Sequence, residues 1–455
     1  MFLEKIFHPL LSKVNDILDV IFRSETKPTS NKLKLFCFGI WALNACKSIR
    51  FTFNHFLKFC SNTKLSSHYY TFSDGMTAYK DWGFNLFSHT LDNVVINNDA
   101  PIILAADDTL VEKFGTKFEY YSTLFDHTER NGTSYVNGHC FVSTIAKIPL
   151  SRNNTKQYET IQIAHRMWTG DNTKIDIAKE LLSRCIDIVG KEKRIYVEFD
   201  SWYSRGTLLE LAKYDNVVIN CAVRCDTALY AIPDPSTKKR GRPRIRGKRI
   251  RIDDIPLKKV KGTDYRVGSM KVLTNIFGNT PVLATVTCPI SGDGKRRLFL
   301  CTDTEPFENL SPEYFASGDK KESMALSLVR CDPMFTALAL YLLRWGIEVT
   351  FYELKTFWGF NDYRLRSKSG IEALLNLEGL VYGMSAILPW LHSAFSDLID
   401  LSLQERRYHI GLIINRHLFL QRLLAWLETA ENSDDLPSAC RAFEEEEFRE
   451  RQKSA

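Results

Sequence analysis

The chain has 455 residues, more than one hydrophobic core usually serves, so we expect two or three domains. Hydrophobic residues make up 44% of it and charged residues 25%, a balance typical of a soluble globular protein rather than a disordered or membrane-embedded one. The net charge of +6 is only a mild indication of a polyanionic partner.

Cysteine usage and hydropathy indicate in which cellular compartment the protein is expected. The 11 cysteines include no CxxC pair, which predicts reduced thiols in a cytosolic protein rather than a disulfide framework. The longest apolar run, from Leu35 to Cys46, is too short to span a bilayer and predicts a core helix. We therefore expect no membrane partner.

Residues 1–95 have the pattern of a helical N-terminal domain. Two short helices are predicted around a break at SNTKLSS, residues 61–67, where serines can cap the second helix. A basic helical module of this kind often docks on DNA, and a plain packing domain is the alternative. We expect a DNA-binding domain here.

Residues 96–225 change to strands and helices. PIILAADDTLVE, residues 101–112, begins as a buried strand and ends in acids, and residues 137–150 predict a second strand. Residues 172–190 have helical period, KRIYVEFD (193–200) is a strand ending in Asp200, and RGTLLELAKY (205–214) predicts a helix. A strand at 216–223 follows. Antiparallel strands followed by β-α-β units predict an α/β mixed sheet.

Residues 226–330 predict an antiparallel β-rich insertion. Two β-like runs are joined by FGNTP and a third follows SGDG, where the glycines indicate turns. The insertion begins with KKRGRPRIRGKRIR, residues 238–251, in which nine of fourteen residues are Lys or Arg. Such a repulsive run predicts a basic loop rather than part of a core.

Residues 331–395 complete the predicted core with two apolar helices. Asp332 and Pro333 suit the start of the first helix, and Gly359 suits its end. A second apolar helix is predicted at 370–388. Residues 396–455 are expected to form a helical C-terminal region with an acidic tail.

Four polar side chains share one face of the first of these helices. At about 100° per residue, Tyr341, Arg344, Glu348 and Lys355 fall within roughly 60° of one another. A charged stripe on an otherwise apolar helix suggests that it faces a site. The plain alternative is an ordinary Arg344–Glu348 pair four residues apart, in the less favourable orientation.

Acids from separate elements suggest a metal site. Asp107 and Asp108 end the first core strand, Asp200 ends a later one, and Glu348 lies on the helix. Carboxylates brought together from rigid elements can bind two Mg²⁺ or Mn²⁺ ions, which catalyse phosphodiester cleavage. The alternative for each Asp is a turn or cap residue.

In this combination the chain resembles a large group of bacterial insertion-sequence transposases of the DDE superfamily, which have an RNase H-like core. Their Y-(2)-R-(3)-E-(6)-K motif is matched at every spacing by Tyr341, Arg344, Glu348 and Lys355. Their D-x-T motif is matched by Asp107, with Asp108 as an alternative. Their second aspartate is matched by Asp200, and they too carry a β-rich insertion before the glutamate.

The resemblance implies that Asp107, Asp200 and Glu348 are catalytic and hold two Mg²⁺ or Mn²⁺ ions. Arg344 and Lys355 would contact DNA phosphates, and Tyr341 would do the same or order the helix. The implied reaction is cut-and-paste transposition: cleavage at the transposon ends, a hairpin intermediate, and strand transfer into target DNA. The implied assembly is a homodimer on DNA in the bacterial cytoplasm, associated with the nucleoid.

The basic loop has two interpretations as a DNA-binding element. Arg240, Arg242 and Arg244 lie in an RGRPR stretch similar to an AT-hook, whose arginines enter a narrow A·T minor groove. A loop that grips phosphates without reading sequence is the interpretation we favour, because short motifs often match by chance.

Three other functions stay open on sequence alone. One is a catalytically inactive, DNA-binding transposase relative, and another is a metal-dependent nuclease that cuts without strand transfer. The third is a scaffold with incidental acids, which leaves the charged stripe of the apolar helix unexplained.

Overall fold

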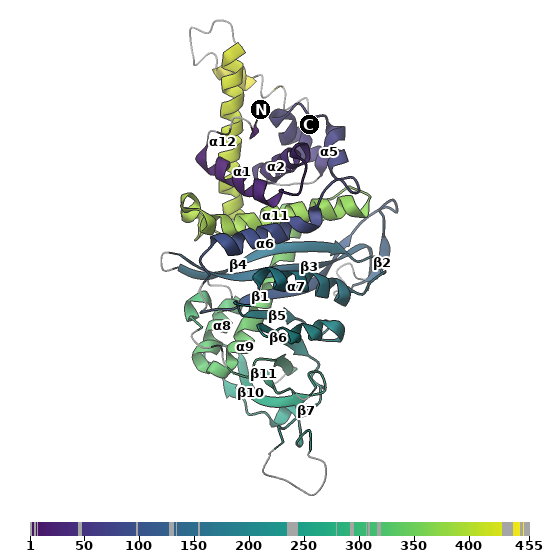
Figure 1. The fold of residues 1–455 in the computed structure, drawn as a ribbon, viewed down its shortest axis with the longest axis vertical. Helices are drawn as coiled ribbons and strands as arrows, with labels where there is room; N and C mark the ends of the chain where they lie inside the picture. Colours follow the sequence, from purple (N-terminus) through teal and green to yellow (C-terminus); the bar gives the residue numbers. More distant parts are fainter. Residues whose placement is uncertain are drawn as a thin grey trace.

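The structure is a computed structural model of the chain (Figure 1). It describes all residues except 1, 4–5, 7, 44–47, 97–98, 127–131, 133, 153–154, 234–243, 279, 292–294, 306, 308–309, 316–319, 430–439, 446–448 and 450–455. Within the described part, helices gather toward one end of the molecule and a long sheet runs toward the other (Figure 1).

Five strands form the centre of the sheet in the order β4-β3-β1-β5-β6. Strands β4 and β1 are both antiparallel to β3, whereas β5 and β6 run parallel to β1. This is the strand order of an RNase H-like core, so the predicted α/β mixed sheet is confirmed. The strands are β1 (Ile102–Glu112), β2 (Ser122–Phe125), β3 (Tyr135–Arg152), β4 (Thr155–Met167), β5 (Ile195–Phe199) and β6 (Val217–Val223).

The strands of the insertion lengthen the same sheet instead of forming a separate one. Strand β12 pairs antiparallel with β6, and β11, β10, β7 and β8 follow outward. The antiparallel runs predicted on either side of FGNTP and after SGDG are β10, β11 and β12. The strands are β7 (Leu229–Tyr230), β8 (Arg249–Ile250), β9 (Lys258–Lys259), β10 (Tyr265–Thr274), β11 (Val282–Pro289) and β12 (Arg297–Cys301).

Helices precede the first strand and follow the last. The early helices are α1 (Pro9–Ile21), α2 (Lys27–Ala42), α3 (Ile49–Thr52), η2 (Phe53–Leu57), α4 (Lys58–Cys60), α5 (Leu65–Thr71) and α6 (Tyr79–Asn93). The late ones are η5 (Pro312–Phe315), α8 (Lys320–Cys331), α11 (Lys368–Leu391), η9 (Ser393–Leu398) and α12 (Leu403–Thr429). The early helices pack with α11 and α12, so the two ends of the described chain meet in one helical layer (Figure 1).

Between β4 and β6 lie α7 (Lys174–Val189) and η3 (Gly206–Lys213). Helix α7 begins with a capping box, in which Thr173 and Asp176 bond each other's backbone N–H, and ends at Gly190. The segment predicted as a helix at 205–214 is a 3₁₀ helix, η3. A further short 3₁₀ turn, η4 (Ile252–Asp254), lies in the insertion.

The helix expected to carry the charged stripe is continuous but irregular. Asp332 accepts a hydrogen bond from the backbone N–H of Met334, and Gly359 ends the helix in the left-handed conformation at φ 94°. Between them the winding alternates: η6 (Pro333–Phe335), α9 (Thr336–Leu342), η7 (Leu343–Trp345), α10 (Gly346–Glu353) and the π-turn η8 (Leu354–Trp358).

Two helical stretches, Pro333–Trp358 and Lys368–Leu391, are long and apolar enough to cross a membrane by composition alone. The most apolar window of Lys368–Leu391 is wholly buried inside the protein, as in the core helix of a soluble fold.

Candidate active site

Asp107 lies at the middle of β1, facing the irregular helix. The sequence placed it at the end of a strand, but β1 continues to Glu112 because Thr109–Glu112 stay paired with β3. The parallel partner β5 ends sooner, its last paired residue on β1 being Ala105. Asp107 therefore stands just past the point where β5 leaves the sheet.

Asp200 follows β5 directly and forms a tight turn. One of its carboxylate oxygens, Oδ1, accepts hydrogen bonds from the backbone N–H groups of Trp202 and Tyr203, at 2.9 and 3.0 Å. The Ser204 hydroxyl donates to the Asp200 carbonyl at 2.7 Å. Asp200 is thus the turn residue that the plain alternative described, with no hydrogen bond to Oδ2 among those described here.

Arg344 forms ion pairs with two of the candidate ligands, Asp107 and Glu348. Its Nη1 lies 2.9 Å from Asp107 Oδ2, and its Nη2 lies 3.7 Å from Glu348 Oε1. The side chains of Arg344 and Asp107 are 13% and 15% exposed, whereas that of Glu348 is 39% exposed. The Arg344–Glu348 pair is therefore part of a three-membered ionic group rather than an isolated helix pair.

The pKa of Asp107 responds to the charges of the other two candidate carboxylates, Asp200 and Glu348. Burial raises the pKa of Asp107 to about 7, with the Arg344 charge opposing the rise and the charges of Asp200, Glu348 and Asp108 adding to it. A buried carboxyl whose pKa is raised in part by neighbouring like charges is characteristic of functional sites.

The donors fit a divalent cation in kind. They are carboxylate oxygens, the ligands that Mg²⁺ and Mn²⁺ prefer, and they come from two strands and a packed helix. Among the described residues, however, no three acidic, histidine or cysteine side chains lie close enough together to form a ready-made ion cage. Arg344 lies between two of the carboxylates and balances part of their charge.

The other two residues of the stripe also face the sheet. Tyr341 is buried, with its hydroxyl 3.5 Å from the carbonyl oxygen of Phe199, the residue before Asp200. The Lys355 ammonium donates to Thr109 Oγ1 at 2.6 Å and to the Leu110 carbonyl at 2.8 Å, both on β1. The whole stripe therefore faces β1 and β5.

Asp108 faces the opposite side of β1 from Asp107, as alternate residues of a strand do. Its carboxylate accepts hydrogen bonds from Lys174 Nζ at 2.6 Å, Tyr203 Oη at 3.0 Å and Cys140 Sγ at 3.4 Å. Lys174 is the first residue of α7, and nothing in its local sequence marks it. It is a site residue that sequence reasoning missed.

The three arginines expected to bind DNA belong to the basic stretch at the start of the insertion. Arg240 and Arg242 fall outside the described residues, and Arg244 is exposed. The strands β7 and β8, which flank this segment, lie at the opposite end of the molecule from α1 and α12 (Figure 1). Among the described residues, no hydrogen bond or ion pair joins Arg244 to the candidate carboxylates.

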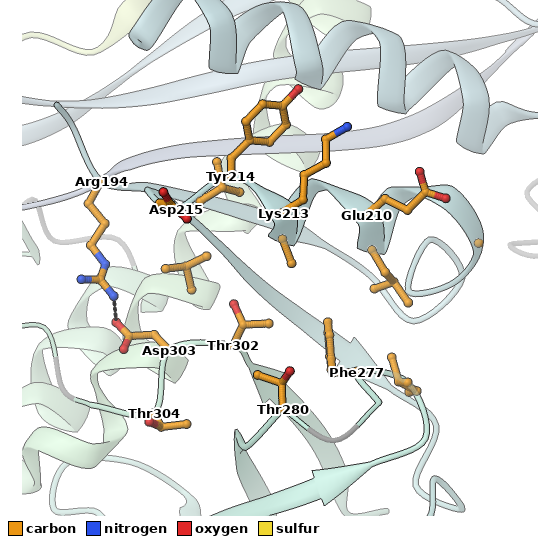
Figure 2. Close-up of a pocket in the computed structure, with 16 residues that line it drawn as sticks. Arg194, Glu210, Lys213, Tyr214, Asp215, Phe277, Thr280, Thr302, Asp303 and Thr304 are labelled. Atoms are coloured by element: carbon orange, nitrogen blue, oxygen red, sulfur yellow. Dashed lines mark hydrogen bonds and ion pairs between the residues drawn. The ribbon is translucent and has the colours of Figure 1, made fainter. Parts of the chain in front are cut away.

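Two of the cavities lie at opposite ends of β5 and β6. One, of about 350 Å³, opens beside Asp200 and is also lined by Arg297, Arg344 and Trp345. The other, of about 870 Å³, lies where β5 and β6 begin, at the end of these strands away from Asp200. Figure 2 shows the second cavity, with Arg194 paired to Asp303 at 2.6 Å. Its lining mixes both signs of charge.

A family model of known proteins matches part of this chain. Residues 85–270 match the family model of the DDE superfamily endonucleases, so this part of the chain is similar to that family. The matched segment contains Asp107 and Asp200, whereas Glu348 lies beyond it. The match supports a nuclease or transposase, and DDE endonucleases generally use divalent metals. The group with the four-residue motif stays a prediction.

The solved structures similar to this chain include a piggyBac transposase synaptic complex with hairpin DNA, studied by cryo-EM. The two chains are 13% identical with a TM-score of 0.47, over 96% of this chain and 85% of that one. A likeness at this level carries no weight for function. No curated protein matches this chain.

Proposed function

We propose that the protein is a DNA transposase that cleaves transposon ends and joins them to target DNA by cut-and-paste transposition. The observation that carries the proposal is that Arg344 pairs with both Asp107 and Glu348 on an RNase H-like sheet, with Asp200 directly after β5, the strand beside β1. The DDE family match over the first two of these residues supports it.

Asp107, Asp200 and Glu348 would hold the divalent cations, for which we propose two Mg²⁺ or Mn²⁺ ions. Such ions supply an activated attacking oxygen and a stabilised leaving oxygen in phosphodiester transfer. The protein's own part is positioning. Asp200 is fixed by its turn, Asp107 by the pairing of β1 with β3, and Glu348 by a helix packed on the sheet.

The cationic groups of the stripe divide into two roles. Arg344 is tied to the carboxylates but lines the cavity beside Asp200, so we propose that it contacts a phosphate of the cleaved strand. Lys355 holds the helix to β1 in the structure, and a phosphate contact there would add to that bond or replace it. Buried Tyr341 orders the helix against β5.

We further propose that two copies act together on paired DNA ends, in the bacterial cytoplasm near the nucleoid. The support for this assembly and location is the resemblance of the Tyr341–Lys355 motif to that of insertion-sequence transposases.

The test is cleavage of a plasmid carrying the element with its own flanking ends, in Mg²⁺ or Mn²⁺. We expect end-specific double-strand breaks with wild type and their loss, by a factor of at least about 10³, with Glu348→Gln. Glu353→Gln is the matched control, because Glu353 lies on the same helix but accepts from Tyr382 at 2.6 Å. It should keep cleavage.

Two outcomes would replace the proposal. Breaks without joined products, in an assay that includes target DNA, would indicate a nuclease that lacks strand transfer. Binding of the ends without cleavage under any divalent metal would indicate a catalytically inactive relative.

A further inference from the structure

The paired aspartates of β1 have different surroundings. Asp107 faces Arg344 and Glu348, whereas Asp108 is turned to the other face of the sheet and is surrounded by donors. Both oxygens of Asp108 are engaged: Oδ1 accepts from Tyr203, and Oδ2 accepts from Lys174 and Cys140. A carboxylate committed to three donors is a poor candidate for a metal ligand.

Tyr203 connects Asp108 to the second candidate ligand. Its hydroxyl donates to Asp108 Oδ1 at 3.0 Å, and its backbone N–H donates to Asp200 Oδ1, also at 3.0 Å. The side chain is 1% exposed. One buried residue therefore links the strand that carries Asp107 to the turn that carries Asp200.

Lys174 donates to the other oxygen of Asp108 and lies near two tryptophan rings. Its ammonium lies 2.6 Å from Asp108 Oδ2 and 5.4 and 5.6 Å from the ring centres of Trp168 and Trp202. Trp202 in turn donates its backbone N–H to Asp200 Oδ1. Lys174 thus approaches the Asp200 turn from α7, so that three elements meet at Asp108.

We infer that Asp108, Tyr203 and Lys174 form a clamp that sets the position of Asp200 relative to Asp107, so that Asp108 is a positioning residue and Asp107 is the ligand. The inference rests on the proposed function, because it concerns the metal site that Asp107 and Asp200 would form. It assigns roles to Tyr203 and Lys174 that the motifs do not contain. Partners behind metal ligands commonly change metal affinity by 10- to 100-fold when removed.

The test measures Mn²⁺ binding by the full-length protein without DNA, from the electron paramagnetic resonance signal of free Mn²⁺. Tyr203→Phe removes only the hydroxyl, and we expect Mn²⁺ affinity to fall about tenfold or more. Tyr196→Phe is the matched control. Tyr196 is also buried on this part of the chain, and its hydroxyl donates to Asp303 Oδ2 at 2.9 Å, at the far end of β5. The Tyr196→Phe variant should lose about as much thermal stability as Tyr203→Phe and keep the Mn²⁺ affinity of wild type.

Substitution of Lys174 gives a second test. The direction in which Mn²⁺ affinity changes shows whether Lys174 acts through geometry or through charge. Removing a cation near a metal site raises metal affinity if the cation acts only by repulsion. The clamp predicts the opposite for Lys174→Met, a fall in Mn²⁺ affinity, and recovery in Lys174→Arg, which restores a donor to Asp108. Lys174 is partly exposed, so this variant is expected to fold even if Tyr203→Phe does not.

The possible results distinguish failure of the clamp from failure of the metal site. Equal Mn²⁺ affinity in Tyr203→Phe and Tyr196→Phe, or tighter binding in Lys174→Met, would overturn the clamp while the metal site stands. Binding by wild type that is lost in Glu348→Gln would support the metal site itself. Absence of Mn²⁺ binding by wild type would remove the site, and the clamp with it.

Discussion

His68 is a titratable residue buried among aromatic rings in the helical layer. Its imidazole is fully buried on α5, with its ring centre 5.5 Å from those of Phe36 and Phe53. Burial, aided by the charge of Lys32, lowers the pKa of His68 to about 4. The native protein therefore holds this histidine neutral where an unfolded chain would protonate it.

This difference predicts acid sensitivity. Between about pH 6.5 and pH 4 the unfolded state binds a proton that the native state does not, so stability is complete above pH 6.5 and falls below it. We expect His68→Phe to reduce the loss of unfolding free energy between pH 7 and pH 4.5 by about 2 kcal/mol. Denaturant unfolding at the two pH values measures it, and an unchanged loss would contradict the assignment.

The residues of the candidate site differ in how far sequence could place them. The alternation of a strand already requires Asp107 and Asp108 to face opposite sides, and helical period already put Tyr341, Arg344, Glu348 and Lys355 on one face. Which aspartate faces the helix depends on packing between segments more than 200 residues apart, such as Arg344 with Asp107. Sequence spacing contains no information of that kind.

At the scale of elements, α6 packs on β4 with almost no space between them. A Cβ atom built on Gly83 of α6 would lie 1.8 Å from the carbonyl oxygen of Ile163 on β4. A backbone carbonyl inside a sheet cannot turn aside as a side chain can. Glycine at this position is therefore what allows the helix to approach the sheet.

Gly83→Ala should destabilise the protein strongly. We expect a loss of at least about 3 kcal/mol in unfolding free energy, because the helix must move off the sheet. Gly383→Ala on α11 is the matched control, since the atoms nearest its Cβ would be side-chain atoms of Leu86 and Ile161, at 3.2 and 3.3 Å. That variant should stay within about 1 kcal/mol of wild type. Equal losses in chemical denaturation would show that contact with the backbone is not the cause.

The irregular helix shows what local sequence determines and what it does not. Its start and end follow from Asp332, Pro333 and Gly359, whose preferences are local, and both were predictable. The tightened turn at Leu343–Trp345 and the widened one at Leu354–Trp358 were not. They adjust the helix to the strands beneath it, where Arg344 and Lys355 reach β1.

At the scale of the whole molecule, one sheet connects the candidate site to the insertion. Strand order in the core follows from alternating strand and helix patterns, which the sequence shows plainly. The pairing of β12 with β6 does not, because it joins Leu298–Cys301 to Asn220–Val223 across the entire insertion. Turn residues predicted that the insertion is antiparallel but not that it continues the core sheet.

This continuity places β7, which precedes the basic stretch in the chain, at the opposite end of the molecule from α1 and α12 (Figure 1). We expect the basic stretch to bind DNA that flanks the reacting phosphate rather than to take part in the chemistry. Binding of that kind depends on counterion release and falls as salt rises.

Replacing Arg240, Arg242 and Arg244 together with glutamine should therefore weaken DNA binding without sequence preference. We expect the slope of log affinity against log salt to become shallower by about 0.9 for each phosphate that the variant no longer neutralises. Fluorescence anisotropy over a range of salt, on A·T-rich and G·C-rich duplexes of equal length, measures both slope and preference. Equal weakening on the two duplexes is expected from phosphate binding. Weakening confined to the A·T-rich duplex would mean instead that these arginines enter the minor groove.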